Sequence, residues 1–226
     1  MGTPRVALVT GASSGLGEHI AGKLLDLGYV VFGWARAWPN EHSYYHDPKF
    51  IPETVDVTNF ATVYNALCNW QYDELDLLIN NAGVFKEYPF ELSSYMDIDG
   101  IIDINLKGAM NVTLACIKAM WHVSRIINIG SVSGLDGIEN QAIYSASKAG
   151  LQAFSNSLMK ELHDSQITTI IPGGIDTDLW KKHNVRDTSS FMTMYDVWKA
   201  IQFIIESDPN VTIKEIVMFP KEEYHP

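Results

Sequence analysis

Tyr144 and Lys148 are the residues whose types and spacing are best suited to acid–base chemistry. They lie in the stretch IYSASKAGLQAFSNSLMKEL, residues 143–162, where apolar residues such as Leu151 and Leu158 recur at helical spacing. Continued backwards in steps of three and four residues, this apolar stripe passes through Lys148 and Tyr144. The pattern therefore predicts a helix that turns a lysine and a phenol towards the protein interior.

A cation beside a phenol can make the phenol a usable acid and base near neutral pH. Free phenol titrates near pH ~10, so lowering its pKa by ~3 units corresponds to about 4 kcal/mol of preferential stabilisation of the phenolate. Lys148 is one helical turn from Tyr144 and could supply much of this stabilisation. The alternative is structural, with the lysine stem extended along apolar surface beside a core tyrosine.

Short β-branched runs alternate with helical segments along almost the whole chain. The expected strands are VALVT, YVVFGW, TVDV, LDLLIN, RIINIG, ITTII and TIKEIVMF, and the expected helices lie near 15–27, 59–70, 94–121, 143–162 and 194–207. Strands joined by helical crossovers form a parallel sheet that is covered on both faces. The sequence thus predicts an α/β fold, a Rossmann-like doubly wound parallel sheet, in a single domain spanning residues 1–226.

The first strand-to-helix turn, TGASSGLG at residues 10–17, has the composition of a phosphate-binding turn. Gly11, Gly15 and Gly17 allow a tight turn, a close approach to a pyrophosphate and close packing of the next helix on the sheet. The free N–H groups and the positive dipole end of that helix would face the phosphates. Its position in the first strand–helix unit therefore predicts a dinucleotide site.

Five motifs occur together: TGASSGLG, NNAG at 80–83, Asn105, YSASK and PGGIDT at 172–177. In their order and approximate spacing they resemble the short-chain dehydrogenase/reductase family in its single-domain form. The resemblance implies that Tyr144 is the catalytic acid/base and Lys148 its partner. It also implies that Ser131, in NIGSVSG, binds substrate and that Asn105 completes a proton relay.

The same resemblance implies a set of residues that contact a nicotinamide dinucleotide. They come from the glycine-rich turn, the ends of the second and third strands, NNAG, the catalytic helix and PGGIDT. The set is Gly11, Ser13, Ser14, Gly15, Leu16, Gly17, Arg36, Asp56, Asn80, Ala82, Gly83, Tyr144, Lys148, Pro172, Gly173, Ile175 and Thr177. Among these, Asp56 is expected to bind adenine.

The end of the second strand favours NADP(H) over NAD(H). An NAD-binding protein usually presents an acid there to the ribose 2′-hydroxyl, whereas an NADP-binding one offers an arginine to the 2′-phosphate. The position of the acid is occupied by Ala35, and the next residue is Arg36. The alternative is that Arg36 is a solvated surface charge.

Composition excludes several other classes of function. The formal net charge is −11 and there is no run of Lys and Arg, so a nucleic-acid or anionic-membrane surface is not expected. The chain has only two cysteines, Cys68 and Cys116, which are expected to be buried free thiols. His42 and His46 have a spacing that could hold a metal on a helix, but their Pro-flanked, polar surroundings indicate a loop, so no metal is expected.

The sequence therefore predicts an NADP(H)-dependent oxidoreductase that moves hydride between nicotinamide and a carbonyl or secondary alcohol. The alternative is a non-catalytic dinucleotide-binding protein, a redox sensor or scaffold. We expect a cytoplasmic location without a signal peptide or spanning helix, and the resemblance implies a homodimer or homotetramer.

Residues 179–194 are expected to cover the substrate, with Trp180, His183, Phe191 and Met192 next to the basic Lys181, Lys182 and Arg186. This mixed lining would suit an acidic or aromatic carbonyl compound, but a surface helix is the alternative.

Overall fold

A seven-stranded parallel sheet forms the centre of the molecule. The computed structural model describes residues 4–177 and 187–222. The strands are β1 (Val6–Thr10), β2 (Val30–Ala35), β3 (Phe50–Thr54), β4 (Glu74–Asn80), β5 (His122–Ile129), β6 (Gln166–Pro172) and β7 (Glu215–Met218), and their order across the sheet is β3-β2-β1-β4-β5-β6-β7. Every neighbouring pair is parallel. The predicted doubly wound fold is confirmed.

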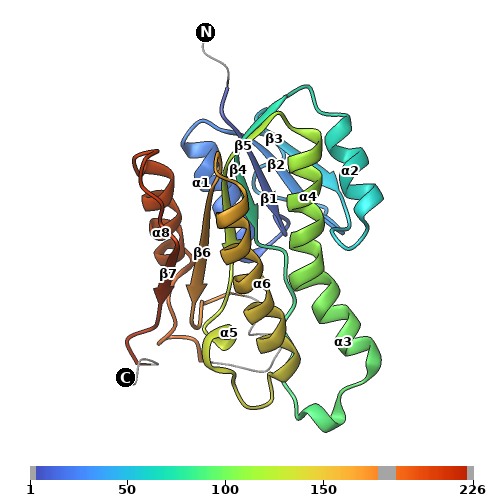
Figure 1. Ribbon diagram of the computed structural model, residues 1–226, viewed down its shortest axis with the longest axis vertical. Coiled ribbons are helices and arrows are strands. Elements are labelled where there is room, and N and C mark those ends of the chain that lie inside the picture. The colour runs from blue at the N-terminus through green and yellow to red at the C-terminus, as the bar shows by residue number, and fades with distance from the viewer. Residues whose placement is uncertain (1–3, 178–186, 223–226) are drawn as a thin grey trace.

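Helices cover both faces of this sheet, as Figure 1 shows. The bounds are α1 (Gly15–Asp26), α2 (Phe60–Cys68), α3 (Tyr95–Ile102), α4 (Ala109–Ala119), α5 (Ser133–Asp136), α6 (Ala142–Glu161) and α8 (Met194–Glu206), with a short 3-10 turn at Phe90–Leu92. One core packs α1 and α8 against the sheet, and the other packs α2, α4 and α6 against its opposite face. The two apolar faces of the central strands explain their nearly continuous hydrophobic sequences.

The third strand starts earlier than its sequence pattern predicts. The apolar run TVDV indicates residues 54–57, whereas the structure pairs Phe50–Thr54 with β2. This segment is an edge strand with alternating burial, and an edge tolerates Pro52, which cannot donate to a second neighbour. Val55 and Val57 are buried in the turn that follows, so their hydrophobicity reflects packing beneath a helix and not strand pairing.

The long helix predicted near 94–121 is interrupted. Residues Asp103–Gly108 form a π-helical turn between α3 and α4, and such turns often occur at functional sites. The stretch Tyr95–Ala119 is long and apolar enough to span a bilayer by length and composition alone. Its buried side chains pack against α2, α6 and the sheet, as in the core helix of a globular fold.

The two cysteines differ in their surroundings. Cys116 is fully buried on α4, and this burial raises the pKa of its thiol. Cys68 is exposed at the end of α2, so the expectation of two buried thiols holds only for Cys116. Both are free thiols.

All carboxyl ends of the strands lie along one edge of the sheet, because every strand runs in the same direction. In Figure 1 the arrows of β6 and β7 point towards this edge, where α5 and the start of α6 lie. Ligand sites in open α/β sheets lie outside this edge, next to the point where strand order reverses. Here the chain reverses between β1 and β4, which are neighbours in the sheet.

Candidate active site

The turn between β1 and α1 forms an open cradle of glycines. Gly11 and Gly15 have positive φ angles of 69° and 58°, which non-glycine residues rarely adopt. A Cβ atom on Gly17 would lie 2.1 Å from the carbonyl oxygen of Gly11, whereas a Cβ on Gly15 would meet nothing within 4 Å. Ser14 precedes α1 without a side-chain cap, so the first N–H groups of the helix keep their capacity to bind an anion. Residues Ser13 and Leu16, both half-buried, complete the turn.

Asn81 holds this cradle in place. Its Nδ2 donates to the carbonyl oxygen of Thr10 at 2.8 Å, and the backbone N–H groups of Asn81 and Ala82 both donate to the Thr10 hydroxyl at 3.0 Å. From NNAG, Asn80 was predicted to contact the cofactor, whereas no role was predicted for Asn81. The motif NNAG identifies this segment, but the sequence does not indicate which of its two asparagine side chains points towards the glycine-rich turn.

The side chain of Asn80 lies in the interior instead. Its Nδ2 donates to Thr113 Oγ1 at 3.0 Å and to Asn128 Oδ1 at 2.8 Å, which ties β4 to α4 and β5. Asn128 in turn donates to Ser155 on α6 at 2.7 Å. The side chain of Asn80 thus connects elements behind the cradle, and its contact with a cofactor stays a prediction.

Lys148 is buried in α6, as its place on the apolar stripe predicts. Only 6% of the residue is exposed, and Nζ donates to the carbonyl oxygen of Ile129 at the end of β5 at 2.8 Å. Burial lowers the pKa of Lys148 to about 8, because the charged ammonium loses hydration. A Cβ on Gly83 would lie 3.8 Å from this Nζ, so the last residue of NNAG adjoins the lysine.

Tyr144 is half-buried one turn before Lys148. Its ring packs edge-on against Phe85 at a centroid distance of 4.9 Å, and Lys148 Nζ lies 5.7 Å from the ring centroid. Burial raises the pKa of Tyr144, and a hydrogen bond with Ser131 partly opposes this rise. The expected lowering of the phenol pKa by Lys148 is thus not found in the protein without cofactor, since desolvation of the phenolate outweighs the stabilising contacts.

Ser131 follows β5 and is oriented by a short chain of hydroxyl and amide groups. Its Oγ accepts a hydrogen bond from the Ser133 backbone N–H at 3.2 Å and lies 3.3 Å from the Ser133 hydroxyl. Ser133 donates to Gln141 Oε1 at 2.8 Å. The hydrogen bond between Ser131 and Tyr144 brings these two predicted site residues together.

Asn105 lies in the π-helical turn and is buried. Its Oδ1 accepts from the Val84 backbone N–H at 2.8 Å, while Nδ2 donates to the Val84 carbonyl at 2.9 Å and to Ser147 Oγ at 3.1 Å. Ser147 precedes Lys148 on α6. The asparagine side chain therefore fastens the segment after NNAG to α6, and its carboxamide is occupied by these contacts.

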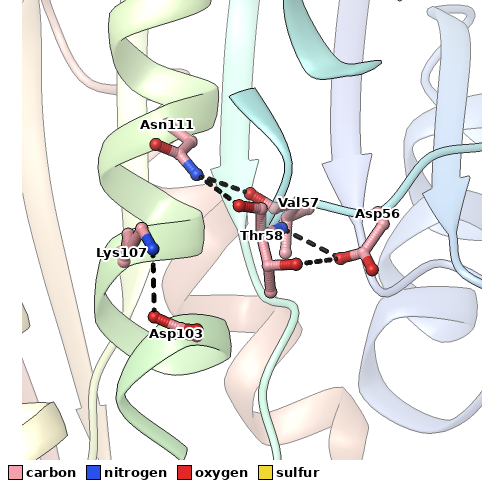
Figure 2. Close-up of polar contacts among 6 residues, drawn as sticks. All are labelled: Asp56, Val57, Thr58, Asp103, Lys107 and Asn111. Carbon is pink, nitrogen blue, oxygen red and sulfur yellow. Dashed lines mark hydrogen bonds and ion pairs between the residues drawn. The ribbon is translucent and has the colours of Figure 1, made fainter. Parts of the chain in front are cut away.

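Asp56 lies in the turn after β3, which Figure 2 shows beside α4. Its Oδ1 accepts hydrogen bonds from the backbone N–H of Thr58 at 2.9 Å and from the Thr58 hydroxyl at 2.8 Å. Arg36 is exposed directly after β2, the strand that lies between β1 and β3. Both residues thus lie near the carboxyl edge of the sheet on the cradle's side.

His42 connects the aromatic loop after β2 to the cradle. It is buried, its Nε2 lies 3.1 Å from the carbonyl oxygen of Ala12, and its ring stacks on Phe50 with an interplanar angle of 2°. His46 is exposed. Within residues 4–177 and 187–222, no three His, Cys, Asp or Glu side chains are grouped to hold a metal ion.

The PGGIDT segment leaves the end of β6 and approaches the cradle. Pro172 is the last residue of β6, Gly173 donates its N–H to the Met218 carbonyl at 2.8 Å, and Ile175 forms a parallel bridge with Met192. Thr177 lines an open cavity of about 380 Å³ together with Gly15, Glu18, His19, Tyr44, Asp176 and Met194. Trp180, Lys181, Lys182, His183 and Arg186, predicted to cover the substrate, lie outside the described residues.

Comparisons with known proteins agree with this geometry. The short chain dehydrogenase family matches residues 5–188. The acetoacetyl-CoA reductase of Cupriavidus necator is 35% identical over 193 residues, which cover 79% of this chain and 78% of that protein. An oxidoreductase of Staphylococcus aureus is 30% identical over 229 residues, covering 96% and 98%. The closed form of serine dehydrogenase complexed with NADP+ has a TM-score of 0.88 at 27% identity, covering 97% of this chain and 96% of that one.

A dinucleotide cradle, a Tyr–Lys helix and a serine meet at one edge of a Rossmann-like sheet, and the family match spans most of the chain. The chain therefore belongs to the short-chain dehydrogenase/reductase family, oxidoreductases that use a nicotinamide dinucleotide to act on alcohol and carbonyl groups of small molecules.

Proposed function

We propose that this protein is an NADP(H)-dependent oxidoreductase that interconverts a carbonyl compound and a secondary alcohol. The observation that carries the proposal is the grouping of Ser131, Tyr144 and Lys148 at the carboxyl edge of the sheet. A dinucleotide-binding protein without turnover has no chemical need for this grouping. Assay of a panel of ketones, aldehydes and hydroxy acids by NADPH absorbance tests the proposal.

The residues of the cradle fit a dinucleotide. The space above Gly15 is open, and the uncapped start of α1 offers N–H groups to a pyrophosphate. When bound, the nicotinamide supplies or accepts the hydride. We assign Thr177 and Ile175 to the nicotinamide end and Asp56 to the adenine end, in line with the order of the motifs.

Tyr144 is proposed as the acid/base. During carbonyl reduction its phenol gives a proton to the substrate oxygen, and during alcohol oxidation the phenolate takes that proton back. Lys148 holds a positive charge within 5.7 Å of the ring centroid and so favours the phenolate. Ser131 donates a hydrogen bond to the substrate oxygen, where negative charge develops.

Ser131→Ala should lower turnover by about 10²-fold and leave NADPH affinity nearly unchanged. The hydroxyl is proposed to meet the substrate oxygen and not the dinucleotide, so its loss affects only the reacting complex. Initial rates and a cofactor titration monitored by Trp fluorescence measure the two effects separately. Ser157→Ala, an exposed serine on the same helix as Tyr144, is the matched control. Full activity of Ser131→Ala would assign the oxygen-binding donor to another residue.

NADPH should bind more tightly than NADH because Arg36 can pair with the 2′-phosphate in a charge-assisted way. Arg36→Ala should raise the Kd of NADPH about ten-fold while the Kd of NADH changes little. Lys118→Ala removes another exposed positive charge far along the chain and serves as the control. Equal losses of affinity for the two cofactors would refute the role of Arg36.

The first assay panel should contain both carbonyl compounds and hydroxy compounds. Acetoacetyl-CoA and serine belong in the first assay panel, since two similar proteins are named after them. If residues 179–194 cover the substrate as proposed, their mixed apolar and basic side chains suit acidic or aromatic carbonyl compounds, which should be assayed next. Wild-type protein that binds NADPH but turns over no compound of the panel would favour the non-catalytic alternative.

We also propose a homodimer or homotetramer formed through the long helices. Met110, Leu114 and Ile117 are exposed at helical spacing on α4, and Trp121 beyond its end is 90% exposed. A second copy of the chain would remove this apolar stripe from water, and sedimentation velocity measures the resulting mass.

A cytoplasmic location stays a prediction from the sequence, and localisation of a tagged chain tests it.

A further inference from the structure

Asn111 reaches from α4 to the turn that carries Asp56. Its Nδ2 donates to the carbonyl oxygens of Val57 at 3.0 Å and Thr58 at 3.2 Å, as the dashed lines in Figure 2 show. The nearby Lys107 pairs with Asp103 of its own helix at 3.2 Å instead. Asn111 is therefore the polar link between this helix and the two backbone carbonyls that follow Asp56.

The helix approaches the turn very closely at this point. A Cβ on Gly108, one turn before Asn111, would lie 2.7 Å from Val57 Cγ2. Val57 is buried, and Asn111 is half-buried beside it. Apolar contact at Gly108 and two hydrogen bonds at Asn111 thus fix the backbone of Val57 from one side.

The Asp56 turn presents a donor and an acceptor that match adenine. Asp56 uses Oδ1 for Thr58, while its Oδ2 and the backbone N–H of Val57 form no hydrogen bond within the described part of the chain. The Watson–Crick edge of adenine places an amino donor beside a ring-nitrogen acceptor. A carboxylate oxygen next to a backbone N–H is the complementary pair.

We propose that Asn111 is a positioning residue for the adenine end of the cofactor. It fixes the carbonyls of Val57 and Thr58 and thereby the direction of the Val57 N–H and the Asp56 carboxylate. This inference rests on the proposed function, because it requires a dinucleotide whose adenine lies at Asp56. Asn111 itself touches neither the substrate nor the reacting atoms.

Asn111→Leu keeps the approximate volume of the side chain and removes both hydrogen bonds. The Kd of NADPH and of 2′,5′-ADP should each rise about ten-fold, whereas the Kd of reduced nicotinamide mononucleotide, which lacks adenine, should change less than about two-fold. Isothermal titration calorimetry measures all three ligands without any turnover. Asn65→Leu, an exposed asparagine on α2, should leave all three affinities at the parent values.

A merely structural role for Asn111 would weaken the mononucleotide and the adenine ligands alike, and this outcome would overturn the proposal. Parent affinity for 2′,5′-ADP in Asn111→Leu would overturn it as well. If the leucine variant does not fold, Asn111→Asp keeps the shape without the N–H donor and should show the same selective loss. Failure of the parent protein to bind NADPH at all would instead refute the proposed function.

Discussion

Tyr144→Phe should reduce turnover by about 10²- to 10⁴-fold while the protein still binds NADPH with nearly the parent affinity. The substitution keeps the ring, so the edge-on contact with Phe85 at 4.9 Å is retained and the fold is preserved. It removes only the hydroxyl that is proposed to exchange a proton with the substrate oxygen. Initial rates with an active substrate, together with cofactor titration, measure both effects.

The control for Tyr144→Phe is Tyr95→Phe, because Tyr95 is 76% exposed on α3 and should tolerate loss of its hydroxyl. A Tyr144→Phe protein that turns over at the parent rate would exclude Tyr144 as the acid/base. The pH dependence of the reaction rate provides an independent test of this role. Alcohol oxidation in the parent should rise with pH, because the phenolate accepts the proton, and the midpoint belongs to Tyr144 and Lys148 together.

The pKa of Tyr144 should differ between the protein alone and the protein with bound cofactor. Burial raises the pKa of Tyr144 in the protein alone. The positive charge of an oxidised nicotinamide favours the phenolate, so the midpoint of alcohol oxidation should fall below the pKa of free tyrosine.

Lys148→Met should weaken NADPH binding and reduce turnover by about 10²-fold or more, yet stabilise the protein without cofactor at neutral pH. Burial lowers the pKa of Lys148 from 10.5 to about 8, so between these values the unfolded chain holds a proton that the folded chain does not. The free energy of unfolding therefore rises with pH from about 8 to 10.5, and below about 8 the full cost of the buried ammonium is present. At pH 7 the buried ammonium then costs roughly 3 kcal/mol.

The net gain in stability from Lys148→Met should be smaller, about 1–2 kcal/mol at pH 7, because the carbonyl of Ile129 loses its donor at 2.8 Å. This corresponds to a rise in Tm of a few degrees, on the order of 2–8 °C. Thermal unfolding at pH 7 and pH 10 checks the sign, since the gain should shrink at the higher pH. Lys160→Met, exposed on the same helix, should change neither activity nor stability by comparable amounts. A Lys148→Met protein less stable than the parent at pH 7 would show that the ammonium stabilises the fold.

The regular elements, including α6, follow from periodicity in the sequence. Alternating β-branched and helical segments predict the parallel sheet, because a strand that is buried on both faces is apolar throughout. The stripe of α6 predicts that Lys148 is buried, and its exposed fraction of 6% confirms this. Side chains on one helix keep a constant angular spacing, so their common face is visible without any tertiary information.

Periodicity does not indicate how residues far apart in the chain meet. Asn80 and Asn81 are neighbours in one motif, but one enters the interior and the other holds the cradle, because the direction of each depends on partners in β1, β5 and α4. The edge strand at Phe50–Thr54 depends on its register with β2. Asn111 meets Val57, 54 residues earlier, only when α4 packs beside the turn after β3.

The sequence by itself determined the sheet, the order of its motifs and the identity of the acid–base pair that we propose. The tertiary structure alone decided the electrostatics of that pair. The spacing of Tyr144 and Lys148 predicted a lowered phenol pKa, whereas burial raises it in the protein without cofactor. The electrostatic effect of a neighbour one turn away can be predicted from the helix. Desolvation depends on every group that surrounds the ring, including Phe85 and Ser131 from the loops that follow β4 and β5.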